Sequence, residues 1–132
     1  MKTLFERGDF TLHGGGKSRW RINAEGLSDE DWDALVIAAR PLMIGGRLRT
    51  IVGIPSGGLA FAAAIERAYP VHPSGGGVLI VDDVLTTGRS MAEARLAALS
   101  DSPQSEFRNS RGLVAFARGP LPGWVRAIWK LG

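Results

Sequence analysis

Short apolar runs and helically spaced apolar residues alternate along the second half of this chain. Runs at residues 50–54, 78–81 and 112–117 consist mainly of β-branched and aliphatic residues, which is typical of strands buried on both faces. Residues 59–68 have the apolar spacing of a helix, and residues 124–131 alternate as a strand does. Strand, glycine turn and helix in repetition predict an α/β fold with a small, mostly parallel sheet flanked by helices.

The first half predicts a different unit. Residues 9–23 have the pattern of two short strands joined by a glycine turn at 14–16. Ser28 is a plausible N-cap for a following helix, because three acidic residues come directly after it and suit a helix N-terminus. The glycine pair at 45–46 ends this unit. The predicted inner face of the helix consists of Trp32, Leu35, Val36 and Ala39.

A second capped helix is predicted after the strand at 78–81. Ser90 with Glu93 three residues on forms a capping-box pattern, which predicts that the helix begins there. Ala92, Leu96 and Leu99 would form its inner face. Residues 101–110 are polar and predict a loop.

Composition excludes several classes of function. The 132 residues contain no cysteine and only two histidines, so disulfides and thiolate chemistry are excluded and a zinc site is disfavoured. The net charge of +3 favours an anionic ligand, although it is too small to indicate nucleic acid by itself. The N-terminus lacks the apolar run of a signal peptide, and no apolar stretch reaches bilayer-spanning length. We therefore expect a cytoplasmic protein without a membrane partner.

The segment VLIVDDVLTTGRS at residues 78–90 carries the clearest chemistry. The predicted strand delivers Asp82 and Asp83 at its end, and a loop with hydroxyl side chains and Gly88 leads into a helix. Backbone N–H groups at such a turn form a cradle for an anion, and carboxylates beside it suit sugar hydroxyls or Mg²⁺. Phosphate and ribose together fit this segment, which lacks the lysine spacing of a Walker loop.

This segment resembles the phosphoribosyl pyrophosphate (PRPP) motif of the type I phosphoribosyltransferases. The resemblance implies that Asp82 and Asp83 are catalytic residues that hold the ribose hydroxyls. It also implies a binding loop for the sugar phosphate, made of Val84, Leu85, Thr86, Thr87, Gly88, Arg89 and Ser90.

Two further segments agree with this resemblance. IVGIPSGG at residues 51–58 is similar to the family's pyrophosphate-binding loop, which implies that role for Pro55, Ser56, Gly57 and Gly58. Residues 10–23 are similar to the start of orotate phosphoribosyltransferase, where two strands form a hood over the base. We expect one domain over residues 1–132, with the hood and first helix in 1–48 and the PRPP-binding core in 49–132. The candidate base contacts are His13, Lys17, Trp20 and Arg118.

The sequence departs from the orotate pattern at three places. His13 stands where that family usually has a lysine, and Ala117 replaces the Asp of an Asp-Arg pair that ends in Arg118. Only residues 69–77 separate the second predicted helix from the next strand. The family normally has a strand and a long basic mobile loop in this interval, which covers the reacting pyrophosphate. Its absence puts efficient catalysis in doubt rather than PRPP binding.

The resemblance implies an enzyme that transfers ribose 5-phosphate from Mg-PRPP to a nucleobase and releases pyrophosphate. Orotate is the favoured acceptor, Mg²⁺ is the expected cofactor, and a homodimer is expected from the relatives. A sensor that binds PRPP or a nucleotide without turnover is the alternative, which the short 69–77 interval supports. A weaker alternative is an RNA-linked regulator, based on Lys17, Arg19 and Arg21 around Trp20.

Overall fold

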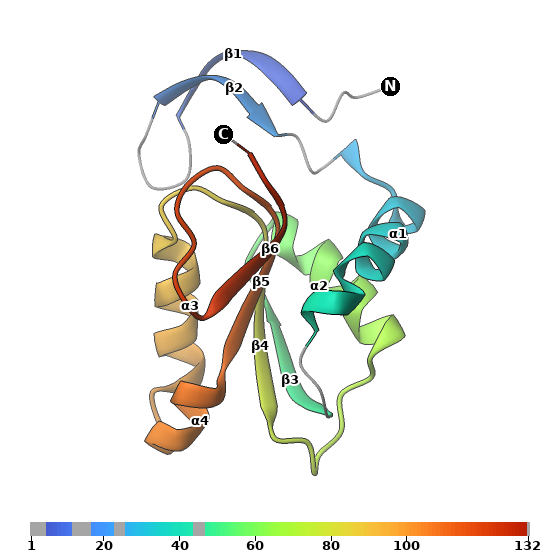
Figure 1. Ribbon diagram of the computed structural model, residues 1–132, viewed down its shortest axis with the longest axis vertical. Coiled ribbons are helices and arrows are strands. Elements are labelled where there is room, and N and C mark those ends of the chain that lie inside the picture. The colour runs from blue at the N-terminus through green and yellow to red at the C-terminus, as the bar shows by residue number, and fades with distance from the viewer. Residues whose placement is uncertain (1–4, 12–16, 23–25, 44–46, 132) are drawn as a thin grey trace.

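The centre of the molecule is a four-stranded sheet in the order β3-β4-β5-β6 (Figure 1). In this computed structural model the described residues are 5–11, 17–22, 26–43 and 47–131. All neighbouring strands of this sheet are parallel, which confirms the predicted parallel α/β architecture. The strands are β3 (Leu48–Gly53), β4 (Gly77–Leu85), β5 (Arg111–Ala117) and β6 (Val125–Lys130).

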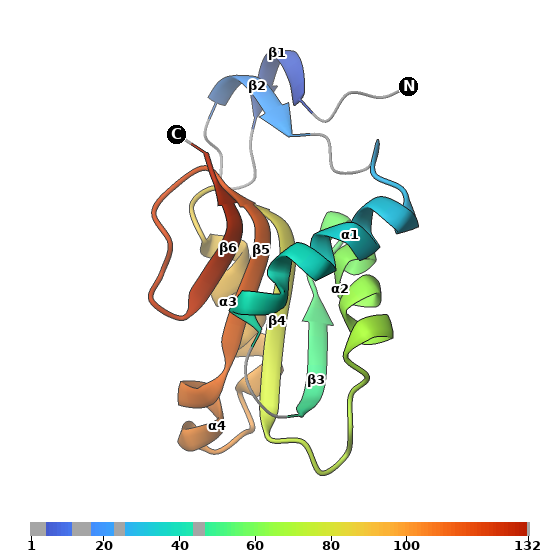
Figure 2. The ribbon, with the colours of Figure 1, turned by 45° about the vertical axis from the view of Figure 1, so that its right-hand side comes forward.

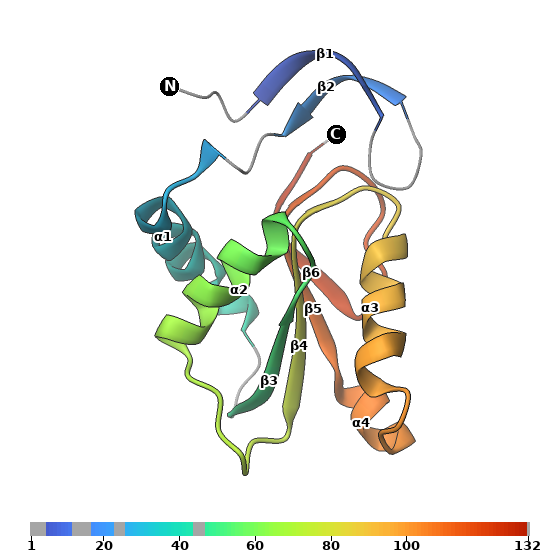
Figure 3. The same ribbon diagram turned by 180° about the vertical axis from the view of Figure 1, so that it is seen from behind.

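Helices cover both faces of the sheet (Figures 1 and 3). On one face lie α1 (Asp29–Ala39), the short 3-10 helix η2 (Arg40–Leu42) and α2 (Gly57–Ala68). On the other face lie α3 (Arg89–Leu99) and α4 (Gln104–Asn109). Each pair of layers encloses its own apolar cluster, and alternate residues of β4 and β5 contribute to the two clusters.

The predicted N-cap of α1 is confirmed, and the cap fixes where this helix begins. The Ser28 hydroxyl accepts a hydrogen bond from the backbone N–H of Asp31, and the Asp31 carboxylate accepts one from the N–H of Ser28. The helix then buries Trp32, Val36 and Ala39, with Leu35 packed at the edge of the cluster. The Trp32 ring stacks on Phe61 of α2 at 5.0 Å between ring centroids, and this contact joins the two helices.

An antiparallel hairpin precedes the helices. It consists of β1 (Phe5–Thr11) and β2 (Lys17–Ile22), which confirms the two predicted strands. Figures 1 and 2 show it lying over the carboxyl ends of the sheet strands, where the expected hood would be. The predicted glycine turns at 14–16 and 45–46 lie outside the described residues.

The chain passes from α2 to β4 directly, at the amino-terminal edge of the sheet. The backbone N–H of His72 donates to the carbonyl of Leu48, the first residue of β3, and Gly75 lies against the Leu48 backbone. No strand occurs between α2 and β4, whose intervening residues all belong to the described part of the chain. β3 is consequently an edge strand.

Three local predictions are wrong. β4 extends to Leu85, so Asp82 and Asp83 lie within the strand rather than after it. α3 begins at Arg89 with Gly88 as its N-cap, and Glu93 pairs with Arg89 instead of completing a box with Ser90. Residues 101–110 contain the short helix α4.

The inner face of α3 is also different from the prediction. Met91 and Leu99 are buried, whereas Ala92 is exposed and Leu96 is 59% exposed. The sequence of this helix contains many alanines and few large apolar residues, so its apolar spacing does not indicate clearly which face is buried. None of the helices in the described part of the chain is both long and apolar enough to cross a membrane.

Replacing Trp32 with alanine should destabilise the fold by about 3–5 kcal/mol, because the indole is fully buried against Phe61. Urea unfolding measures this change. Ile37→Ala is the matched control on the same helix, since Ile37 is 66% exposed and its truncation should change the free energy of unfolding by less than about 0.5 kcal/mol. An equal decrease in the free energy of unfolding of the two variants would contradict the assigned packing of α1.

Candidate functional site

Two loops follow the carboxyl ends of the neighbouring strands β3 and β4. One loop joins β3 to α2 through residues 54–56, and the other joins β4 to α3 through residues 86–88. Because β3 and β4 are neighbouring parallel strands, both loops lie at the same edge of the sheet. The N–H of Ile54 donates to the carbonyl of Val81 at 2.9 Å and ties the first of these loops to strand β4.

Gly57 and Gly58 sit directly against the acidic end of β4. A Cβ atom on Gly58 would lie 2.6 Å from the carbonyl oxygen of Val81 and 3.1 Å from the Cα of Asp82. A Cβ atom on Gly57 would collide with the carboxylate of Asp83. The sequence indicated that these glycines permit close approach of a ligand; the structure shows that they permit close approach of the first turn of α2 to strand β4. The peptide bond between Pro55 and Ser56 in this turn is cis.

The carboxyl pair is unequal. Asp82 is only 4% exposed, and one of its oxygens accepts a hydrogen bond from the N–H of Asp83 at 2.8 Å. Asp83 is half-buried, and its Oδ1 accepts from the N–H of Val84 at 2.8 Å. Burial, followed by the interaction with the Asp83 side chain through a hydrogen bond and through its negative charge, raises the pKa of Asp82 from 3.8 to about 8, although the backbone N–H of Asp83 acts in the opposite direction. Asp82 is therefore protonated at neutral pH in the absence of a ligand.

The loop after β4 has the form of an anion cradle. Gly88 has φ +83°, a left-handed conformation that favours glycine, and it forms the N-cap of α3. The N–H of Arg89 donates to Thr87 Oγ1 at 3.3 Å, and the Arg89 guanidinium pairs with Glu93. Backbone N–H groups at a helix N-terminus attract phosphate. A shallow hollow lies here, lined by Asp82, Val84, Leu85, Thr86, Thr87, Gly88, Arg89, Ser90 and Met91.

A third segment supports this loop, and sequence reasoning missed its role. Gly119 lies so close to the Thr86 carbonyl that a Cβ atom would clash with it, and the Pro122 ring packs 3.5 Å from the Cβ position of Gly88. The N–H of Arg118 donates to the Leu85 carbonyl at 2.8 Å. The only signal in the sequence is the cluster of glycine and proline at residues 119–123, which predicts a turn without saying what it contacts.

The structure brings most of the predicted site residues together. Residues 55–58 form the turn into α2 and lie against Asp82 and Asp83 of β4, residues 84–90 continue from that strand into α3, and Arg118 follows β5 beside the end of β4. Lys17 and Trp20 belong to β2 of the overlying hairpin, in register with Thr11 and Arg7. His13 lies outside the described residues. Among the described residues, no group of three or more His, Cys, Asp and Glu side chains is placed to hold a metal ion.

Comparisons with known proteins point to one fold. No family model matches the chain. It is 30% identical to the orotate phosphoribosyltransferase of Aeropyrum pernix over 112 residues, which are 67% of this chain and 60% of that protein. The chain thus spans about 60% of the length of this curated relative.

Solved structures extend the likeness to nearly the whole chain. A crystal structure of the Aeropyrum pernix orotate phosphoribosyltransferase matches 97% of this chain and 88% of its own, with a TM-score of 0.69 and 23% identity. The Mycobacterium tuberculosis H37Rv orotate phosphoribosyltransferase matches with a TM-score of 0.70 and 17% identity, over 97% of this chain and 90% of its own. The Leishmania donovani UMP synthase matches with a TM-score of 0.74 and 19% identity, over 97% of this chain and 34% of its own.

The chain has the fold of the type I phosphoribosyltransferases. Within that class, its sequence and fold resemble those of the orotate phosphoribosyltransferases, which confirms the resemblance predicted from the motifs.

Adding a methyl group at Gly58 should destabilise the protein by about 1–3 kcal/mol, because the new Cβ atom meets the β4 backbone, which cannot yield without moving the strand. The matched control is Gly76→Ala, since no atom lies within 4 Å of a Cβ there. Urea unfolding of both variants measures the difference. If Gly58→Ala were as stable as Gly76→Ala, the close contact between Gly58 and the backbone of β4 would be wrong.

The pKa of Asp82 predicts a pH dependence of stability. The folded protein holds this proton more tightly than the unfolded chain, so the free energy of unfolding falls as pH rises from about 4 to about 8. Asp82→Asn removes this fall and should be the more stable protein at pH 7.5, by about 1 kcal/mol or more. The two proteins should converge near pH 4.

Urea unfolding at pH 4.5, 6 and 7.5 measures this pH dependence. Asp101→Asn is the control, because Asp101 is exposed and should leave the pH dependence of the wild type in place. The prediction fails if the free energy of unfolding of the wild type increases with pH more steeply than that of Asp82→Asn. That result would show that Asp82 is ionised in the folded protein.

Proposed function

We propose that this protein transfers ribose 5-phosphate from Mg-PRPP to a nucleobase, with release of pyrophosphate. The observation that carries the proposal is the contact of Gly57 and Gly58, at the turn into α2, with Asp82 and Asp83 of β4, the strand that leads into the turn at residues 86–88. A ligand with phosphate at one end, a polyhydroxyl sugar in the middle and pyrophosphate at the other end matches that order of groups.

Each part of the site has a role in this proposal. The N–H groups and hydroxyls of residues 86–90 bind the 5-phosphate at the N-terminus of α3. Asp82 and Asp83 bind the ribose hydroxyls from the end of β4. The turn at residues 55–58 binds the pyrophosphate at the N-terminus of α2.

Magnesium fits the donor chemistry of the site. Mg²⁺ is coordinated by oxygen atoms. In proteins, these commonly come from water molecules, substrate phosphates and only one or two carboxylates. Asp82 and Asp83 supply two carboxyl groups beside the pyrophosphate turn. When bound, the ion neutralises the developing charge on the leaving pyrophosphate. The protein would hold it mainly through the substrate.

The reaction breaks the bond from the ribose anomeric carbon to the pyrophosphate oxygen and forms one to a ring nitrogen of the base. The leaving oxygen keeps the bonding electron pair, and the attacking nitrogen supplies the new one. Positive charge develops on the sugar, so the chain contributes positioning and charge stabilisation rather than a covalent intermediate. A nearby cation would favour the carboxylate form of Asp82, whose proton would then pass to solvent.

Orotate is the acceptor we favour, because the relatives named above are orotate phosphoribosyltransferases. The hairpin of β1 and β2 lies over the same edge of the sheet and would cover the base. Lys17 and Trp20 of that hairpin, with His13 and Arg118, are the proposed base contacts. An arginine suits the carboxylate of orotate, to which it can donate two hydrogen bonds. We further propose that the protein acts as a homodimer.

A sensor that binds PRPP without turnover is the second candidate. One observation favours it: α2 is connected to β4 without an intervening strand, at the edge of the sheet remote from the site. That connection therefore brings no cover over the pyrophosphate turn. Exclusion of water would then depend on the hairpin or on another chain.

A product assay separates these candidates. The protein is mixed with Mg-PRPP and, in separate reactions, orotate, uracil, adenine, guanine, hypoxanthine and xanthine, and mass spectrometry detects the mononucleotide. We expect orotidine monophosphate from the orotate reaction alone. The double variant Asp82→Asn with Asp83→Asn should lose this product by about 100-fold or more, because it removes the charges that hold the ribose.

Calorimetry with Mg-PRPP decides what a missing product means. Binding to the wild type without product supports the sensor. The double variant binding Mg-PRPP as tightly as the wild type would overturn the assigned site. A Gly57→Ala variant changes the site less than the double variant does, since the atoms nearest to its Cβ atom belong to the Asp83 side chain. Its affinity for Mg-PRPP can be measured in the same way.

A further inference from the structure

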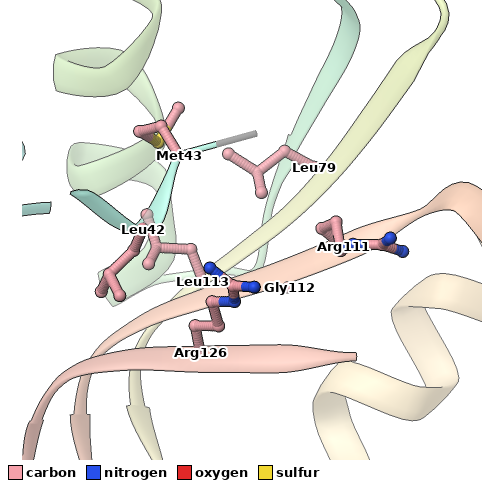
Figure 4. A pocket seen from close by; sticks show the side chains of 7 residues that line it. All are labelled: Leu42, Met43, Leu79, Arg111, Gly112, Leu113 and Arg126. Atoms are coloured by element: carbon pink, nitrogen blue, oxygen red, sulfur yellow. The ribbon is translucent and has the colours of Figure 1, made fainter. Parts of the chain in front are cut away.

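A second hollow lies on the sheet face that α1, η2 and α2 cover, away from the loops described above. Its volume is about 250 Å³. Its lining comes from β4, β5, β6 and the chain at η2, and Figure 4 shows these side chains. Leu79 precedes Asp82 by three residues, and Arg111 and Gly112 begin β5, so the hollow lies toward the amino-terminal edge of the sheet. The lining residues are Leu42, Met43, Leu79, Arg111, Gly112, Leu113 and Arg126.

Strand register explains why apolar and charged groups share this hollow. Leu79 pairs with Arg111 between β4 and β5, and Leu113 pairs with Arg126 between β5 and β6. Paired residues project to the same face of a sheet, and residues two apart on a strand do so as well. The two leucines belong to the cluster under α1 and α2, so both arginines stand on that face. The result is an apolar floor with the Arg126 guanidinium at one side, while the Arg111 side chain leaves the same floor and reaches the carbonyls of Arg108 and Ser110.

The positive charge of this hollow is uncompensated within the described residues. Ion pairs there involve Arg49, Arg67 and Arg89, but neither arginine of the hollow. Arg111 is half-buried, and its Nη1 donates to the carbonyls of Arg108 and Ser110, which hold the guanidinium in place without neutralising it. Burial, and in second place the charge of Arg111, lowers the pKa of Arg95 on the other side of the sheet, which is consistent with excess positive charge.

Arg126 is placed to meet a ligand. It is exposed on the edge strand β6, and Figure 4 shows its guanidinium lying beside Leu113 and close to Leu42. Arg111 extends at the other side of the hollow in the same view. A guanidinium recognises a carboxylate or a phosphate through paired hydrogen bonds, while the leucines and Met43 exclude water from whatever carries that group.

We propose that this hollow is a second ligand site, specific for a small organic anion whose apolar or aromatic body lies on Leu79 and Leu113 and whose carboxylate or phosphate is bound by Arg126, with Arg111 supplying further positive charge. The volume is below the range of ordinary drug-sized pockets, which restricts the ligand to about the size of a substituted single ring. The site is independent of the proposed transferase activity, because it shares no residue with the loops at 55–58 and 82–90.

Amide chemical-shift mapping tests the proposal, because it reports where a probe binds. The probes are phenyl phosphate, benzoate, inorganic phosphate and the uncharged benzyl alcohol, each added to the full-length protein labelled with ¹⁵N. We expect phenyl phosphate or benzoate to shift the amides of Gly112, Leu113 and Arg126. Arg126→Gln should weaken this binding roughly tenfold. Which of the two probes binds more tightly distinguishes a phosphate from a carboxylate ligand.

Two further variants complete the test. Arg67→Gln is the matched control. It also removes one positive charge, but Arg67 lies on α2 in an exposed ion pair with Asp33 of α1, so the variant should leave the affinity for the probes unchanged. Leu42→Trp should fill the hollow and abolish the chemical-shift changes caused by the probes. The remaining amide signals of this variant should stay as well dispersed as those of the wild type, which shows that it folds. These two results would support the site.

Several outcomes would overturn the proposal. Benzyl alcohol binding as tightly as benzoate and phenyl phosphate would show an apolar hollow without anion recognition. Inorganic phosphate equal to phenyl phosphate would show that the apolar floor contributes nothing. Shifts confined to residues 86–90 would assign the binding to the phosphate loop instead, and the absence of shifts at Gly112 and Leu113 with every probe would exclude the site.

Discussion

The approach of Gly58 to the end of β4 is the constraint on which the site depends. The first turn of α2 lies so close to Val81 and Asp82 that no side chain fits between them. This contact places two helix N-termini on neighbouring strands with their N–H groups directed at one edge of the sheet. It also surrounds Asp82 with protein on the side that would otherwise be solvent. The binding geometry and the unusual acid are therefore two results of one packing contact.

The rest of the fold holds this contact in place. Trp32 stacks on Phe61, and Phe61 lies one helical turn beyond Gly58 on the same helix, so α1 braces α2 against the sheet. On the other side, Gly119 and Pro122 brace the loop before α3. Burying a carboxyl group costs stability unless the group is neutral or paired, and the raised pKa of Asp82 reflects that cost. Aromatic packing remote from the site offsets it.

Local patterns in the sequence predicted the parallel sheet, the cap at Ser28 and the two loops that form the site. These features depend on residues close together in the chain, such as a serine directly before three acidic residues or a glycine pair after an apolar run. The contacts that were missed join distant segments. Nothing near Gly57 in sequence indicates Asp83, and nothing near Gly88 indicates Pro122. The start of α3 was misassigned because Ser90 and Glu93 match a cap pattern that the left-handed Gly88 supersedes.

The direct connection from α2 to β4 bears on how such a fold changes over evolutionary time. β3 and β4 are hydrogen-bonded neighbours, so a strand added between α2 and β4 would leave the existing pairs intact by joining a free edge of the sheet, such as the outer edge of β3. Such an addition leaves every existing strand pair and both ligand loops as they are. A strand and its loop are thus a removable module, gained or lost in one event without refolding the core.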